Sequence, residues 1–136
     1  MNEIRVKHVP DFKNEDVVLL AMDGAGLETF LAALTLAERH GSAQLQHRTR
    51  LHDFVTEAGA AGIELADDRV VWRLDHGVAV EIITELTGMA RSNHPCHQYI
   101  DIVSPAPTLV LSRDEYLASS WLTAGREPVF GDQDPD

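Results

Sequence analysis

The alternation of apolar and polar positions divides the first third of the chain into short strands around one helix. Residues 4–9 alternate between the two kinds, which predicts a strand with one solvated face, and Pro10 is expected to end it. Residues 17–22 are continuously apolar over strand length, as in a strand buried on both faces. A helical stripe with a stop signal follows, at Leu27, Phe30, Leu31, Leu34 and Gly41.

The rest of the chain contains further strands and a second helix. The pattern predicts strands over 43–47, 63–65, 70–74, 97–103 and 108–111, with 63–74 forming a hairpin. Residues 51–55 fit either a strand or a single helical turn. For residues 77–90 the β-branched side chains favour a strand, but the adjacent Ile82 and Ile83 break strict alternation. The length of the segment favours a helix over 79–90, which we expect.

The same order of elements occurs twice. Asp23 and Asp75 each follow an apolar strand and precede a helix, and a further strand follows each helix. Two such units predict an α+β fold, a ferredoxin-like βαββαβ sandwich with an extra N-terminal strand and a C-terminal strand–helix extension. The alternative is an irregular α+β fold in which 77–90 is a strand of an antiparallel meander.

The extension is predicted from a local helix-start signal. Ser112 and Glu115 have the spacing of a capping box, in which each side chain bonds the backbone of the other residue. Leu111 and Tyr116 occupy the positions of a hydrophobic staple. We therefore expect a helix over 113–123.

Composition places the chain among small acidic globular proteins. It has 136 residues, 44% hydrophobic side chains, one cysteine and a formal net charge of −11. This length suits a single domain over 1–126, and the Pro- and Asp-containing stretch 127–136 is expected to be a disordered acidic tail. The negative charge argues against nucleic-acid and membrane partners, and the short apolar segments and the lone thiol predict a cytoplasmic protein.

The acidic residues are concentrated in one internal segment. Residues 51–90 hold eight acids and two bases, a net of −6. Such a surface suits a basic protein partner, and a tryptophan within it is a candidate anchor. The candidate partner-binding residues are Trp72, Asp67, Asp68, Glu81 and Glu85.

The strand 97–103 has one polar, titratable face. His97, Tyr99 and Asp101 alternate along it and project to the same side. An imidazole titrates near neutral pH and suits general acid–base chemistry, so these three residues are the catalytic candidates. Cys96 is a weaker candidate for a nucleophile, because a strand directs it away from His97.

Histidines around this strand suggest a metal site as a second possibility. The candidate ligands are His94, His97, His47 and Asp101, and zinc is the metal that they would suit best. The spacing matches no standard structural zinc pattern, so no cofactor is expected. Similarly, Asp23-Gly24-Ala25-Gly26 has Thr29 where a dinucleotide fingerprint needs a third glycine, which favours a helix cap over a nucleotide site.

Two function classes remain. The sequence favours a non-enzymatic binding module that contacts a protein partner or a second copy of itself as a homodimer, and an inhibitor of a basic toxin is one form of it. The alternative is a small enzyme or metal-binding protein with its site on strand 97–103. The first is favoured because the sequence offers acids and bases but no recognisable oxyanion donors, phosphate loop or complete ligand set.

Overall fold

The computed structural model describes residues 2–117, which form eight strands and two helices. In chain order the elements are β1 (Ile4–Phe12), β2 (Glu15–Met22), α1 (Gly24–His40), β3 (Ser42–His47), β4 (Arg50–Thr56), β5 (Ala61–Leu65), β6 (Arg69–Leu74), α2 (His76–Ala90), β7 (Cys96–Asp101) and β8 (Thr108–Arg113). The α+β class and the helix at 77–90 are therefore confirmed, and residues 51–55 belong to a strand. The predicted tail 127–136 lies outside the described residues.

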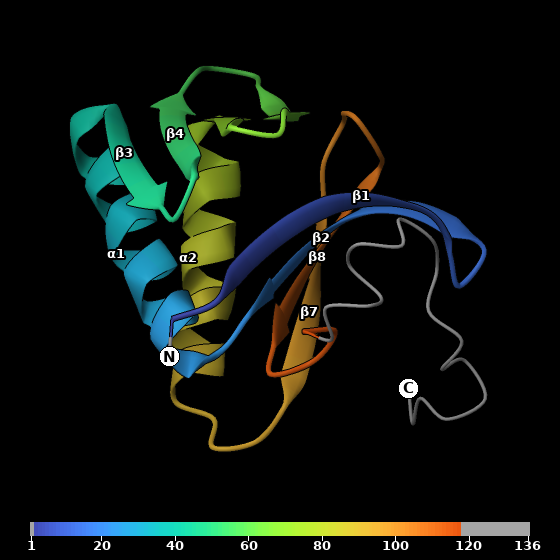
Figure 1. Cartoon of the computed structure of the whole chain (residues 1–136). Coiled ribbons are helices and arrows are strands. Elements are labelled where there is room, and N and C mark those ends of the chain that lie inside the picture. Colours follow the sequence, from blue (N-terminus) through green and yellow to red (C-terminus); the bar gives the residue numbers. More distant parts are fainter. Residues whose placement is uncertain (1, 118–136) are drawn as a thin grey trace.

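The strands form two mixed sheets of four strands each (Figure 1). One sheet, called sheet A here, has the order β1-β2-β8-β7, and the other, sheet B, has the order β3-β4-β6-β5. The expected ferredoxin-like sandwich is therefore wrong, because that fold has one sheet. The hairpins β1–β2 and β3–β4 pair with hairpins from the second half of the chain and not with each other, so no single sheet forms.

The repeated order of elements covers more strands than the sequence pattern indicated. Each half of the chain is a ββαββ unit, and each sheet contains one hairpin from each unit. The central pairs are parallel and equivalent: β2 pairs with β8 from Val17–Thr108 to Met22–Arg113, and β4 pairs with β6 from Leu51–Arg69 to Thr56–Leu74. The molecule thus has an approximate internal two-fold relation between its halves.

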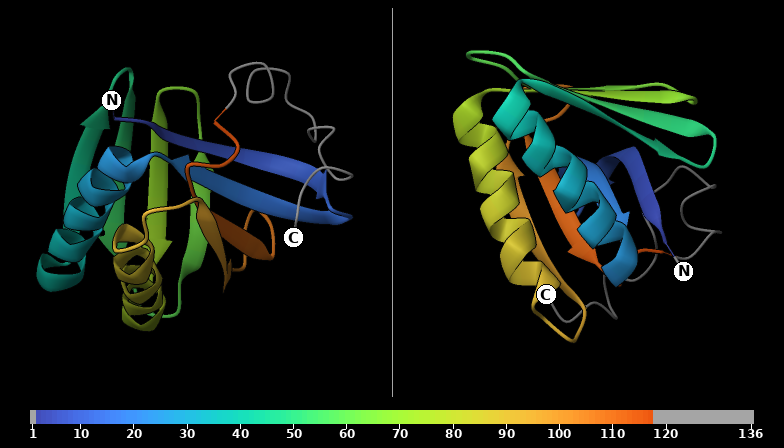
Figure 2. Two further views of the ribbon diagram at one scale, coloured as in Figure 1. Left: turned by 90° about the horizontal axis from the view of Figure 1, so that it is seen from below. Right: turned by 90° about the vertical axis from the view of Figure 1, so that its left-hand side faces the viewer.

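Both helices begin at an aspartate. The Asp23 side chain accepts from the Gly26 amide at 2.7 Å, and the Asp75 side chain accepts from the Val78 amide at 2.8 Å. These bonds satisfy amides that the first helical turn leaves unpaired. Helices α1 and α2 run antiparallel side by side (Figure 2), and His76 at the start of α2 lies 3.2 Å from Glu38 near the end of α1.

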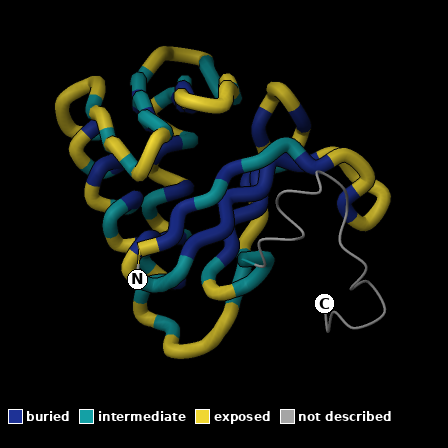
Figure 3. Tube along the Cα trace, viewed as in Figure 1, coloured by how far each residue is buried: buried dark blue, intermediate teal, exposed yellow. Residues whose placement is uncertain are grey.

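The main core lies between the helices and the inner faces of both sheets (Figure 3). Its centre in sheet B is aromatic: the Phe30 ring packs edge-on against Phe54 and Trp72, whose rings stack on each other. Neither helix in the described part of the chain is long and apolar enough to cross a bilayer.

Two local predictions are wrong. Pro10 does not end the first strand, because β1 continues to Phe12. β1 is an edge strand whose register shifts after Val9, and an edge strand with a bulge tolerates a residue that lacks an amide proton.

The helix expected from residue 113 is also absent over 113–117. Ser112 lies in β8, and residues 114–116 form a bend. The spacing that indicated a capping box instead places Ser112 Oγ 3.5 Å from Glu115 Oε1. Residues 118–123 lie outside the described part of the chain.

Candidate functional site

The face of sheet A that points away from the helices carries the titratable strand residues. Cross-strand pairing places its side chains in three rows, which are Arg5-Ala21-Ser112-His97, Lys7-Leu19-Val110-Tyr99 and Val9-Val17-Thr108-Asp101. The middle of this outer face is apolar and buried, with Phe12, Tyr116 and Leu117 packed against it. His97, Tyr99 and Asp101 occupy its β7 edge, as strand alternation predicted.

The corresponding face of sheet B has a different chemistry. Where β2 has Val17, Leu19 and Ala21, the equivalent strand β6 has Arg69, Val71 and Arg73. Arg69 pairs with Asp53, and Arg73 Nε lies 2.6 Å from Glu64. The Arg69 hydrogen bond holds the pKa of Asp53 below its usual value. The outer face of the central strands is thus ion-paired in sheet B and apolar in sheet A.

His97 is held by Glu115, which the sequence pattern places in a helix cap. His97 Nδ1 lies 3.1 Å from Glu115 Oε1, and the fully buried Ser112 lies within reach of the same oxygen. The Tyr99 ring meets the His97 ring edge-on at 5.4 Å between centroids. The His97 imidazole therefore contacts the Tyr99 ring, and the Glu115 carboxylate orients it.

The backbone around Glu115 is strained. Asp114 and Tyr116 both have φ of 60°, in the left-handed region that ordinary side chains rarely adopt. Each such residue costs about 1 kcal/mol or more unless its surroundings compensate. The turn keeps the Glu115 carboxylate beside the end of β7, and the Asp114 amide donates to the Met22 carbonyl at 2.7 Å.

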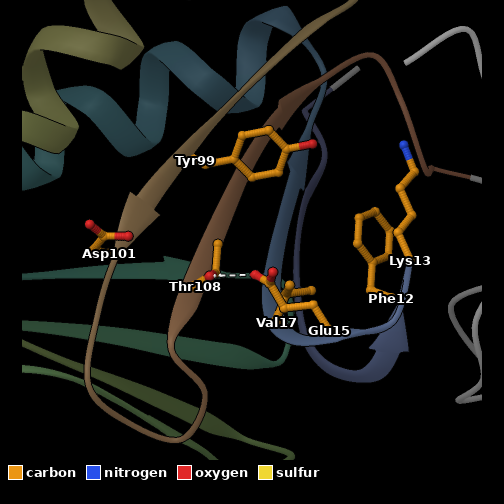
Figure 4. A pocket seen from close by; sticks show the side chains of 7 residues that line it. All are labelled: Phe12, Lys13, Glu15, Val17, Tyr99, Asp101 and Thr108. Carbon is orange, nitrogen blue, oxygen red and sulfur yellow. Dashed lines mark hydrogen bonds between the residues drawn. The ribbon is translucent and has the colours of Figure 1, made fainter.

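An open pocket of about 350 Å³ lies at the other end of the same edge (Figure 4). The β1–β2 hairpin contributes Phe12, Lys13, Glu15 and Val17 to it, and the β7–β8 hairpin contributes Tyr99, Asp101 and Thr108. The Thr108 hydroxyl donates to Glu15 Oε1 at 2.6 Å, which connects the two hairpins across the pocket floor. Tyr99 is 53% exposed at its rim.

The candidate metal ligands are not brought together. His47 lies in β3 of the other sheet, where its Nε2 is 2.9 Å from the Asn2 carbonyl oxygen. His94 lies in the α2–β7 loop with its Nδ1 near the Pro95 carbonyl oxygen, and His97 faces Glu115. Within residues 2–117, no three His, Cys, Asp or Glu side chains are grouped as metal ligands.

The acidic partner-binding candidates divide between separate elements. Asp67 and Asp68 lie in the β5–β6 turn, and Glu81 and Glu85 lie on α2. Trp72 is fully buried and its indole N–H donates to His52 Nδ1 at 3.2 Å. The proposal that Trp72 anchors a partner is therefore corrected: it is a core residue.

The sequence pattern does not reveal the residues that complete this edge. The pattern places Glu115 in a helix cap and does not connect Glu15 or Phe12 with strand β7. Their proximity depends on the pairing of β2 with β8, which is long-range and parallel. Only the spacing of Ser112 and Glu115 gave a local signal, and it indicated the right contact in the wrong secondary structure.

Comparisons of the chain with protein-family models, with curated proteins and with solved structures gave no significant match. The assignment of a function therefore depends on the geometry described above.

Proposed function

We propose that the chain is a protein-binding module whose partner docks on the β7 edge of sheet A, over Tyr99 and the adjoining pocket. The single observation that carries the proposal is the half-exposed Tyr99 ring at the rim of an open pocket that contains the exposed carboxylate of Asp101. Exposed tyrosines beside pockets are typical of the residues that dominate binding energy in interfaces.

The chemistry of the surrounding surface supports this choice of edge. β7 is the last strand of sheet A, so a partner can approach it from the side. Val103, two residues beyond the end of the strand, is an apolar side chain that is 78% exposed. Charged and polar groups around an aromatic centre match the usual organisation of an interface core and rim.

The net charge supports a basic partner. A chain of net charge −11 attracts a positively charged protein over a distance of about 10 Å, the screening length at moderate salt, and repels nucleic acids. A toxin that acts on an acidic substrate would have such a surface, and an inhibitor of it is the concrete form of this function.

Site-specific photo-crosslinking tests the proposal. A photoreactive phenylalanine analogue replaces Tyr99 in the full chain, expressed in cells that contain its native neighbouring genes. A matched protein carries the analogue at Gln44, an exposed residue on the outer face of sheet B. We expect a discrete adduct with a basic protein at position 99 and none at position 44.

The pattern of adducts separates the alternatives. An adduct of twice the chain's mass at position 99 would show a homodimer interface in place of a partner protein. Equal labelling at both positions, or none at position 99, would contradict the proposal. The proteins encoded beside the gene are the first candidates against which to compare the adduct mass.

A second candidate function follows from the His97–Glu115 contact. A carboxylate that orients an imidazole is the arrangement of a general base. Hydrolysis of an activated ester such as p-nitrophenyl acetate would fall about tenfold or more in His97→Ala if this pair acts as a base. Replacement of His94, an exposed histidine near by, is the control. Equal rates in the two variants would exclude a special role of His97 in this reaction.

A further inference from the structure

We infer that the pocket between the two hairpins accepts an arginine side chain of the partner, with the guanidinium against the Tyr99 ring and its N–H groups directed at Asp101 and Glu15. The inference rests on the proposed binding function and specifies the chemistry of the group that enters the site. Three properties of the pocket support it: its aromatic residues, its carboxylates and its net charge.

Two aromatic residues line the pocket, the exposed Tyr99 and the buried Phe12. The Tyr99 ring lies on the side of strand β7 and the Phe12 ring on the side of the β1–β2 hairpin, as Figure 4 shows. The Phe12 ring already receives a cation, because Lys13 Nζ lies 5.8 Å from its centroid. A planar guanidinium stacks on an exposed ring such as that of Tyr99 better than an ammonium does.

Two carboxylates lie within the same pocket. Asp101 is exposed, and within residues 2–117 its side chain makes no hydrogen bond or ion pair. Glu15 accepts the Thr108 hydroxyl through Oε1, which fixes its carboxylate and leaves Oε2 for a second donor. Carboxylates and guanidinium groups form charge-assisted, directional hydrogen bonds.

The charges of the pocket favour a cation over an anion. Glu15 and Asp101 contribute two negative charges against one positive charge from Lys13. Val17 and Thr108 lie beside each other on the pocket floor and suit the aliphatic part of an arginine side chain. An acidic or purely apolar ligand would leave these carboxylates unmatched.

Titration of the full chain with a defined peptide tests the inference. The probe is acetyl-Gly-Arg-Gly-Arg-Gly-amide, and its binding is measured by ¹⁵N–¹H NMR at low salt. The same peptide with lysine in place of both arginines is the comparison. We expect the largest shifts at residues 15, 99 and 101, and affinity for the lysine peptide weaker by about threefold or more.

Matched variants identify the groups responsible. Asp101→Asn and Tyr99→Ala should each weaken binding of the arginine peptide by about tenfold. Asp67→Asn makes the same change of charge in the exposed β5–β6 turn and should leave the affinity unchanged. Lys13→Ala removes the competing cation and should strengthen binding. Preserved NMR spectra of all four variants show that they fold.

The outcomes of this titration differ from those of the crosslinking experiment. Equal weakening by Asp101→Asn and Asp67→Asn, or shifts spread over the whole acidic surface, would overturn the arginine site. In that case a crosslink at position 99 would still support the binding function. Peptide binding at Asp101 without any crosslinked partner would instead support the site and contradict the proposed function.

Discussion

Trp72 donates its indole N–H to Nδ1 of His52 at 3.2 Å, and both side chains are buried in the aromatic core of sheet B. The acceptor role requires a neutral imidazole with its proton on Nε2. Burial, together with the positive charge of Arg50, lowers the pKa of His52 to about 4. The core of sheet B therefore depends on a histidine that must stay uncharged.

The free energy of unfolding should depend on pH through His52. The pKa of His52 is lower in the folded chain than the usual value near 6.5, so the unfolded chain binds more protons between those values. The stabilisation is complete above about pH 6.5 and falls as the pH drops toward 4. Between pH 7 and pH 5 we expect the free energy of unfolding to fall by about 2 kcal/mol through this group, measured by urea denaturation.

A matched pair of variants isolates this effect. His52→Gln keeps an acceptor near Trp72 but does not titrate, so its stability should be lower at pH 7 and nearly constant down to pH 5. His94→Gln changes an exposed histidine and should keep the pH dependence of the native chain. An unchanged pH dependence in His52→Gln would show that other groups cause it.

The two helix caps predict unequal losses of stability. Asp75→Ala removes one hydrogen bond to the first turn of α2 and should cost about 1 kcal/mol. Asp23→Ala also removes the bond from the Glu3 amide at 3.0 Å, which connects β1 to α1, and should cost about 2 kcal/mol. Urea unfolding of both variants measures the difference, and equal costs would contradict the role given to the Glu3 contact.

Two helical glycines should respond in opposite directions to alanine. A Cβ on Gly26 would lie 1.9 Å from the Glu3 carbonyl oxygen, a backbone atom, so Gly26→Ala should destabilise the chain by at least about 2 kcal/mol. A Cβ on Gly88 would meet nothing within 4 Å. Gly88→Ala should therefore stabilise α2 by about 0.5–1 kcal/mol. Thermal denaturation tests both, and a loss of stability in Gly88→Ala would be inconsistent with open space at that position.

Arg113 fastens the end of α2 to sheet A. Its Nη1 donates to the carbonyl oxygens of Met89 at 2.9 Å and Ala90 at 3.2 Å, and it also contacts the Ser92 carbonyl. Arg113→Gln should cost about 2 kcal/mol, because several helix-end carbonyls lose a charged donor. Arg91→Gln, an exposed change at the same helix end, should cost less than about 0.5 kcal/mol. Chemical denaturation that ranked the two variants equally would contradict this role.

The local parts of the candidate site could be predicted from the sequence. The alternation of β7 placed His97, Tyr99 and Asp101 on one face, and the cross-strand register agrees. Trp72 could not be placed, because an isolated tryptophan in an acidic segment fits either a core or an exposed surface. Its burial depends on Phe30 and Phe54, which come from two other elements.

The sequence by itself determined most of the helices and strands of this protein. Helices and strands follow from local properties of the sequence. These are the spacing of apolar side chains and the hydrogen bonds of the cap residues Asp23 and Asp75. Only the tertiary structure decided that hairpins from the two halves pair in parallel into two sheets, since those contacts join residues far apart in the chain. The same pairing placed Glu15 and Phe12 opposite Tyr99 and Asp101, and so formed the pocket that no short segment specifies.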